Sequence, residues 1–389
     1  MSRRRALAQR RRARGYSQEM FADAVGVDRT TVARWEVGDT EPQPWHRPQL
    51  ARALGVSLDD LEALLVISDG ESGPRREDDR VDCALQHPST VDLEAVTALA
   101  ERIRDLDARY DRAPSTSLLG PAGQLHGQVT YLRANASNAR VRTALLVAEA
   151  DAATFTSQLM WDVSQRRDHR EPLAYLERAI EAARAAGDPV REAYAVLRQS
   201  YVALYGAKDA VRGAELARRA AETARGASPS LTGLALLHVA EGKAMSGDAE
   251  SCETALTQAE ALLDRVSTDD IAAAHYTVHE WTRLAGSCYL SLGMPDRAEP
   301  ILRATVHALA AKKKSQAIAM GNLTLALIRQ RKLDEAEAAM HRTIDAVELT
   351  MGGGALVLAF GAGRELRKWR REPWVQEIQD RLLGLIATA

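Results

Sequence analysis

Two short stretches of helical apolar spacing lie within the segment SQEMFADAVGVDRTTVARWEVG, and this pattern constrains the fold more than any other. Met20, Phe21 and Ala24 fall at helical spacing in the first stretch and predict its apolar face. Ser17 is the expected N-cap, because its hydroxyl can accept an unpaired backbone N–H of the first turn. Gly26 suits the left-handed residue that ends such a helix, since it has no Cβ to clash. The first stretch is therefore predicted to be a short helix with defined ends.

A second short helix is predicted directly after this turn. Asp28 is its expected N-cap, where the carboxylate also meets the positive end of the helix dipole. Val32 and Trp35 form its apolar side and Gly38 ends it. Two short helices at a steep angle, the second presenting arginine and small hydroxyl side chains, are typical of a helix-turn-helix that reads the DNA major groove. The side chains left facing outwards are Arg29, Thr30, Thr31, Ala33 and Arg34.

Residues 3–65 resemble the Xre/lambda-repressor-like DNA-binding domain. This resemblance implies five helices, of which the first, fourth and fifth fall at about 3–14, 48–54 and 58–65. Arg10 departs from the family, which has an apolar residue there, so we expect a less well packed first helix. The residues that match the family in order and spacing are Arg11, the run from Arg14 to Glu19, Ala22, Gly26, Val27, Trp35, Glu36, Gly38, the run from Leu50 to Ser57, and Leu61.

The same resemblance implies a buried pair and a DNA-binding surface. Arg11 and Glu36 occupy the positions of an arginine–acid pair that locks the first helix against the third. Arginine can pair bidentately with guanine, and threonine can offer its hydroxyl, or its methyl group to thymine. The residues assigned to DNA binding are Arg14, Gln18, Arg29, Thr30, Thr31 and Arg34, with Gln18 placed on a phosphate.

Other interpretations of these residues stay open. Thr30 and Thr31 could simply cap the helix, and Arg34 could touch phosphate without reading sequence. Residues 3–5 are all arginine and fit either an arm along the DNA backbone or a solvated charge run.

Composition favours a helical protein of the cytoplasm. Lys+Arg number 51 and Asp+Glu 53, so the net charge does not indicate a nucleic-acid binder, but seven of the first 14 residues are arginines with no acid among them. Three widely separated cysteines argue against a disulfide framework and for a reducing compartment. No apolar run approaches membrane-spanning length. Few aromatics, with abundant alanine, leucine, arginine and glutamate, favour an all-α chain.

The residues that follow the predicted DNA-binding domain are charged and contain glycine and proline without apolar periodicity. We therefore predict three parts: an Xre-type domain at 1–67, a flexible linker at 68–89 and a repeat domain at 90–389. Cys83 in this linker fits either a redox sensor or an incidental thiol. In the proline-rich loop before the fourth helix, Trp45 is expected to fold back onto the core.

A repeat follows, and its clearest copy is LTLALIRQRKLDEAEAAMHRTI. Its apolar spacing resembles the tetratricopeptide pattern, in which a small residue stands where two helices cross. The predicted crossing positions are 41, 39, 46 and 38 residues apart, longer than the usual period of about 34. They are Pro172, Gly213, Cys252, Ala298 and Ala336.

Because each unit buries its apolar face only against its neighbours, we expect a right-handed α-solenoid with a concave surface. We expect the glycines at 352–354 to separate the last helices, and residues 366–386 to cap the array. Tetratricopeptide folds bind partner segments on the concave face, where asparagine can hydrogen-bond a peptide backbone. An ordinary polar surface is the alternative for each residue placed there, namely Trp161, Arg198, Tyr205, Glu241, Glu280, Arg283 and Asn322.

No residue pattern indicates an enzyme, a cofactor or a metal. His275 and His279 are predicted on one helix face, but Glu280 follows the second histidine, so the HExxH zinc motif is absent. The glycine triplet lacks the lysine of a phosphate loop, and no Gly-x-Ser-x-Gly or CxxC occurs.

The architecture resembles the peptide-sensing RRNPP regulators and the helix-turn-helix/repeat regulators of actinobacteria. This resemblance implies a cytoplasmic transcriptional regulator that binds double-stranded DNA as a homodimer on inverted repeats. The repeat domain would then serve dimerisation and the sensing of a peptide, protein or small-molecule effector. The alternative is a repeat scaffold that regulates a partner protein, with the first domain as a secondary DNA tether.

Overall fold

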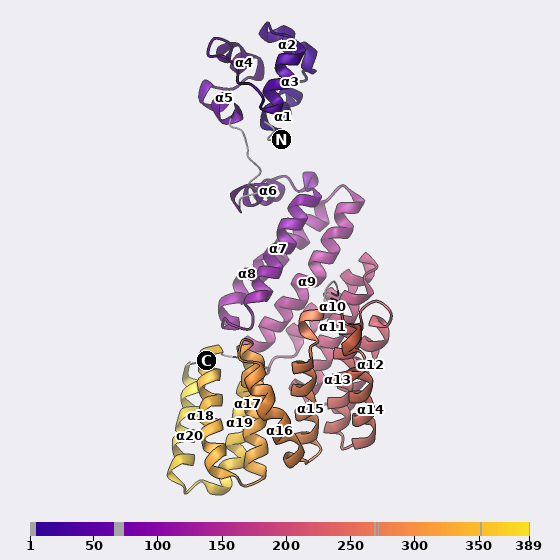
Figure 1. Cartoon of the computed structure of the whole chain (residues 1–389), viewed down its shortest axis with the longest axis vertical. Helices are drawn as coiled ribbons and strands as arrows, with labels where there is room; N and C mark the ends of the chain where they lie inside the picture. Colours follow the sequence, from indigo (N-terminus) through magenta and orange to yellow (C-terminus); the bar gives the residue numbers. More distant parts are fainter. Residues whose placement is uncertain (1–4, 66–73, 268–269, 271, 351, 389) are drawn as a thin grey trace. The chain divides into compact units, whose positions relative to one another are not determined.

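The structure is a computed structural model, and it describes all residues except 1–4, 66–73, 268–269, 271, 351 and 389. Helices are the only regular secondary structure among the described residues (Figure 1). This confirms the all-α prediction. The chain divides into two compact units, residues 1–78 and 79–389.

Five helices of the first unit enclose a small apolar core. The predicted helix ends are confirmed at Ser17, whose Oγ accepts the Met20 N–H at 3.1 Å, and at Gly26 and Gly38, which take φ of +74° and +88°. The helices are α1 (Arg5–Ala13), α2 (Gln18–Val25), α3 (Arg29–Val37), α4 (Arg47–Leu54) and α5 (Leu58–Leu65).

Three details of this unit differ from the sequence predictions. Met20 is 56% exposed, and α2 instead buries Phe21, Ala22 and Val25. The buried face therefore lies about one residue further along the helix than predicted. Asp28 stands at the N-cap of α3 without a capping side-chain hydrogen bond. Trp45 is 69% exposed, because the neighbouring His46 takes the place against the buried Trp35, with ring centroids 5.8 Å apart.

The predicted linker is wrong in its second half, where Pro74–Gln86 form helix α6. Val81 and Ala84 lie three residues apart and are buried in the same apolar cluster as Leu99. Arg80 pairs with Asp92 at 2.6 Å. This segment is so highly charged that its sequence does not indicate the amphipathic helix. Two buried apolar residues on one face are enough to hold the helix when another helix covers that face.

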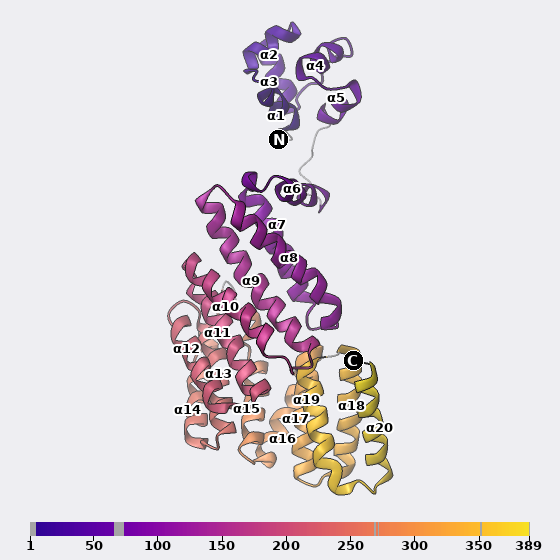
Figure 2. The same cartoon turned by 180° about the vertical axis from the view of Figure 1, so that it is seen from behind.

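The second unit begins with three long helices, and the third of them starts a series of helix pairs that lie side by side (Figures 1 and 2). The long helices are α7 (Leu93–Arg109), α8 (Ser115–Asn135) and α9 (Ala139–Val163). The following helices are α10 (Arg170–Ala186), α11 (Pro189–Tyr201), α12 (Ala210–Ala224), α13 (Pro229–Met245), α14 (Ala249–Glu260), α15 (Val278–Ser291), α16 (Pro295–Ala308), α17 (Lys313–Arg329), α18 (Leu333–Thr350), α19 (Gly353–Leu366) and α20 (Pro373–Thr388). Short 3-10 turns are η1 (Pro88–Thr90), η3 (Leu263–Arg265), η4 (Ala273–His275) and η5 (Arg367–Trp369), and η2 (Val202–Ala207) is a π-helix.

Each predicted crossing residue is buried in the second helix of a pair. Pro172, Gly213, Cys252, Ala298 and Ala336 lie in α10, α12, α14, α16 and α18. The longest spacing, 46 residues, includes the turns η3 and η4, which lengthen the connection between α14 and α15. The helices therefore pair as the repeat pattern predicts.

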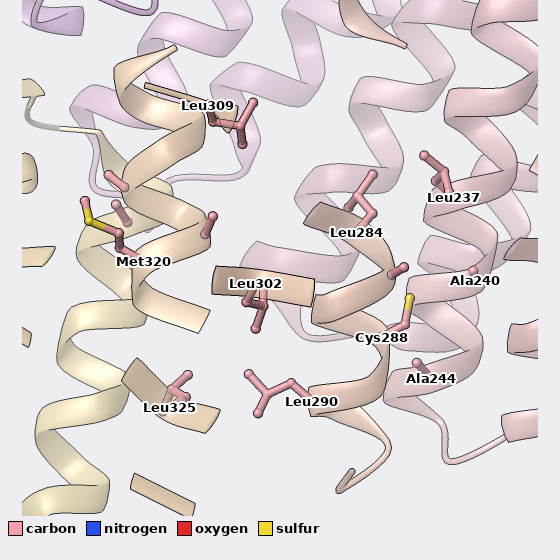
Figure 3. Close-up of a cluster of buried hydrophobic side chains, with 14 of the residues drawn as sticks. Leu237, Ala240, Ala244, Leu284, Cys288, Leu290, Leu302, Leu309, Met320 and Leu325 are labelled. Carbon is pink, nitrogen blue, oxygen red and sulfur yellow. The ribbon is translucent and has the colours of Figure 1, made fainter. Parts of the chain in front are cut away.

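Small residues let the first helices of successive pairs pack closely. Figure 3 shows Ala240 and Ala244 of α13 beside Cys288 of α15, and Leu302 of α16 in the same cluster. A Cβ added to Gly286 of α15 would lie only 2.7 Å from the Leu302 side chain. The apolar core is therefore continuous from one pair to the next.

The end of the array differs from the sequence prediction. Gly352 precedes α19, but Gly353 and Gly354 are its first two residues, so the glycine triplet begins a helix. A Cβ on Gly354 would come within 2.7 Å of the Arg166 guanidinium, which follows α9. The missing side chain at Gly354 therefore leaves room for the Arg166 guanidinium beside α19. The terminal cap comprises α19 as well as α20.

We expect Gly233→Ala to lower the free energy of unfolding by about 1–3 kcal/mol, as overpacking a filled core does. The added methyl group would stand 2.2 Å from the Tyr276 ring, which is 1% exposed. Gly127→Ala on the exposed side of α8 is the control and should stabilise by roughly 0.5–1 kcal/mol, because its Cβ meets no atom within 4 Å. Denaturant titration measures both, and equal effects would contradict the packing at Gly233.

Candidate nucleic-acid interface and repeat-domain cavity

Helix α3 buries one apolar face in the core and exposes polar side chains on the other. Val32 and Trp35 are 0% and 3% exposed and anchor the helix in the core. Arg29, Thr30 and Arg34 are exposed, and Thr31 is half-buried. The side chains assigned to base contacts therefore share the solvent side of one short, anchored helix, which is the arrangement a major-groove reader needs. Their contact with DNA stays a prediction.

A buried ion pair holds α1 against α3. Arg11 Nε donates to Glu36 Oε1 at 2.6 Å, and both side chains are less than one-tenth exposed. The Arg11 guanidinium also donates to the Tyr16 carbonyl at 2.6 Å. The expected Arg11–Glu36 pair is therefore present, with its remaining hydrogen-bonding capacity used within the domain.

The two predicted DNA contacts outside α3 are differently placed. Gln18 Nε2 donates one N–H to Glu36 Oε2 at 2.7 Å, so its second N–H is the one left for a phosphate. Its backbone N–H, at the start of α2, is not involved. Arg14 is exposed, and its guanidinium lies over the turn at Gly55.

Arg10 has a structural function that the apolar expectation did not foresee. Its guanidinium donates to the Leu54 carbonyl at 3.1 Å and to the Gly55 carbonyl at 3.0 Å. These carbonyls end α4 and have no partner within the helix. An arginine therefore replaces apolar packing here by closing the C-terminus of α4.

The second unit encloses a cavity of about 860 Å³. Side chains of the first helices of the pairs form its wall at intervals of three and four residues. On α11 and η2 these are Tyr194, Arg198, Tyr201 and Tyr205, all on one helical face. The other helices that contribute are α7, α9, α13, α15, α17 and α19.

All seven residues predicted for the concave face line this one cavity: Trp161, Arg198, Tyr205, Glu241, Glu280, Arg283 and Asn322. That they bind an effector stays a prediction. The sequence reasoning missed other lining residues, among them Tyr201, His238 and Lys314. The helical period could have found the first two, since Tyr201 stands between Arg198 and Tyr205 and His238 stands three residues before Glu241.

One carboxylate of the wall, Glu241, is held by an aromatic network. Its Oε2 accepts hydrogen bonds from the Tyr205 hydroxyl and from His238 Nδ1, the latter at 2.8 Å. His238 is 2% exposed, and burial lowers the pKa of its imidazole. The ring of Tyr201 packs on His238 with centroids 4.3 Å apart. The π-helix η2 extends α11 and carries Tyr205 to this network.

Two further carboxylates are neutralised by cations of the wall. Glu280 accepts from Arg283 Nε at 2.8 Å and lies 3.8 Å from Lys312 Nζ. Asp162 accepts from the Tyr110 hydroxyl at 2.6 Å and lies 4.0 Å from the ammonium of Lys314. Burial lowers the pKa of Lys314. These pairs leave few acceptors in the wall for a ligand's donors.

The paired histidines of the sequence do not share a helix. His275 belongs to the turn η4, and α15 begins at Val278, one residue before His279. The His275 ring stacks on Tyr194 at 5.6 Å instead. No group of three or more metal-ligating side chains occurs among the described residues. In the same residues no helix is long and apolar enough to cross a membrane.

Residues 7–61 match the family model HTH_3, described as helix-turn-helix. This confirms the resemblance for the first domain, which is a helix-turn-helix domain of the Xre-like type. No curated protein sequence matches the chain.

Three solved structures share 13% identity with the chain. A Rap protein complexed with competence and sporulation factor has a TM-score of 0.44, with 75% of this chain and 98% of that chain covered. PlcR of Bacillus thuringiensis, complexed with the peptide PapR7 and DNA, has a TM-score of 0.35 and coverages of 78% and 93%. A signal transduction ATPase with a tetratricopeptide repeat sensor, from Pyrococcus horikoshii, has a TM-score of 0.40 and coverages of 94% and 63%.

Removing one member of the buried pair in the first domain should be costly. Glu36→Ala leaves Arg11 buried without its acid, and we expect the domain to lose about 3–5 kcal/mol of stability. The double variant Arg11→Met/Glu36→Leu should lose much less, because no unpaired charge is left. Hydrogen exchange of residues 5–37 in the full chain measures both, and equal losses would show that packing rather than charge decides the effect.

The buried histidines should make the protein less stable in mild acid. In the unfolded chain a histidine takes up a proton near its ordinary pKa of about 6.5. In the folded chain burial lowers the pKa of His126 and His238, so these two side chains take up a proton only at a lower pH. The unfolded state therefore binds more protons just below pH 6.5, and the free energy of unfolding falls with pH by at most about 1.4 kcal/mol per unit for each histidine. Thermal melts between pH 7.5 and 5.5 measure this, and His238→Gln should flatten the slope. An unchanged slope would contradict it.

Proposed function

Because residues 7–61 form a helix-turn-helix domain, we propose that the chain is a cytoplasmic transcriptional regulator that reads double-stranded DNA with α3. The observation that carries this proposal is the exposure of Arg29, Thr30 and Arg34 on a helix anchored by Val32 and Trp35. Arg29 lies 3.5 Å from Glu19, but both side chains are about two-thirds exposed, so this pair costs little to exchange for a DNA contact.

The protein acts as a homodimer on inverted repeats. One domain with a single short recognition helix contacts only a few base pairs, and two copies related by a two-fold axis read two half-sites about one helical turn apart. The repeat domain supplies the remaining surface for dimerisation. Light scattering of the full chain, alone and with an operator, measures this state directly.

The repeat domain senses an effector, and the protein works by binding rather than by catalysis. The cavity is lined by α7, α9, α19 and the first helices of the pairs between α9 and α19. A ligand that contacts several of these helices changes their spacing, and in a dimer that change alters the distance between two recognition helices. Peptides, proteins and small molecules are all candidate effectors.

The double variant Arg29→Ala/Arg34→Ala tests specific DNA reading. In genome-wide capture we expect the intact protein to share an inverted repeat among its sites and the variant to lose it. Each lost bidentate base contact is worth about 1–3 kcal/mol, which is roughly 5- to 150-fold in affinity for the operator. Anisotropy titrations against the captured sequence and a scrambled one measure this change.

Arg218→Ala is the control, since Arg218 is an exposed arginine of α12 that pairs with Glu222. It should bind the operator like the intact protein. Scattered, salt-sensitive binding without a shared motif, equal in all three proteins, would mean that only phosphate attraction operates. A stable protein partner found together with that result would favour the scaffold function instead.

A further inference from the structure

The wall of the cavity carries more positively charged than negatively charged side chains. Eight arginine and lysine side chains face five carboxylates. Asp162, Glu241 and Glu280 are each paired within the wall, as described above. The other two, Asp107 and Asp111, make no ion pair among the described residues, and burial raises the pKa of both carboxyls, which favours their uncharged form. Six of the eight cations have an ion-pair partner, and Arg198 and Lys208 have none in the described part of the chain, so a ligand that binds these cations should bring a negative charge.

Arg198 is one of the two wall cations without an ion pair, and its charge acts on Asp107 only at longer range, where it opposes the burial that raises the pKa of that carboxyl. Its guanidinium lies over the rings of Tyr201 and Tyr194, at 4.9 and 5.8 Å from their centroids. Within the described part of the chain it makes no hydrogen bond and no ion pair. Stacking on aromatic faces fixes a guanidinium in place and leaves the N–H groups at its edge free. This is the geometry that suits a bidentate carboxylate.

Two neutral groups of the same wall also lack partners. Trp161 is 5% exposed, and its Nε1–H has no hydrogen-bond acceptor among the described residues. Asn322 is 5% exposed and likewise has no side-chain hydrogen bond in the described structure. Buried polar groups are normally paired, so donors that are unpaired around one cavity are placed to hydrogen-bond a ligand. A cavity of about 860 Å³ falls in the range that encloses a molecule of drug-like size.

We propose that this cavity binds a small organic acid or the free C-terminus of a short peptide, with the ligand's carboxylate paired to the Arg198 guanidinium. This rests on the effector-sensing part of the proposed function and narrows it to one chemical class. Trp161 and Asn322 contribute neutral hydrogen bonds to the body of the ligand. The paired carboxylates Glu241 and Glu280 disfavour a ligand whose only charge is positive.

The test is a thermal-shift and calorimetric titration of the full chain without DNA, so its outcome does not depend on operator binding. The probes are benzoate against benzamide, and apolar tripeptides with a free C-terminus against their C-terminal amides. We expect acids to bind at least about tenfold more tightly than the matching amides. If only the peptides bind, the source is a peptide terminus. If benzoate binds, it is a small organic acid.

Three variants assign the effect to Arg198. Arg198→Gln should abolish the preference for the acid, and Arg198→Lys should weaken it, because a lysine keeps the charge without the planar fork. Arg104→Gln, at the same cavity but with an exposed side chain beside Glu101, should leave the preference unchanged. The melting temperature of ligand-free Arg198→Gln should change little, since the substitution removes stacking on two tyrosine rings but no hydrogen bond or ion pair.

Three results would overturn the proposal. The first is that no acid differs from its amide. The second is an acid preference that persists in Arg198→Gln. The third is a drop in the melting temperature of the ligand-free variant beyond that of Arg104→Gln, which would give Arg198 a structural function.

Discussion

No helix pair of the second unit can bury its apolar face alone, and this constraint determines most of the structure. Each pair needs a neighbour, so the core runs through the whole array, and both ends must be covered. The long helices α7 and α8 cover one end, and α20 covers the other with Val375, Ile378 and Leu382. The glycines that begin α19 let it return to α9, which brings the two ends of the array to one cavity.

The same stacking that buries apolar side chains turns polar ones toward the cavity. A buried charge is costly unless it is paired, and the wall satisfies this requirement for most of its acids. Asp162 reaches Tyr110 and Lys314 from other helices, and Glu280 reaches Lys312 across a connection. These pairs fix the wall in one arrangement. Arg198 makes no ion pair among the described residues and is placed instead by stacking on two tyrosines.

The first unit solves a similar problem at smaller scale. A five-helix domain has a small core, and the Arg11–Glu36 pair adds a directional contact between α1 and α3 that apolar packing alone does not supply. Gln18 and the Tyr16 carbonyl complete the hydrogen bonds of this pair. Helix α3 is thereby held on its buried side, and its outer side chains stay exposed.

The sequence by itself determined what depends on local chemistry and period. It predicted the helix-turn-helix with its caps at Ser17, Gly26 and Gly38, the Arg11–Glu36 pair, and the pairing of helices by small crossing residues. It could not predict α6, the exposure of Trp45 or the helix that Gly353 and Gly354 begin. Each of these depends on which part of the folded chain covers a segment, and the spacing of apolar residues in the sequence does not indicate that. The arrangement of unpaired donors around Arg198 likewise exists only when α7, α9, α11 and α17 meet, so the tertiary structure alone decided it.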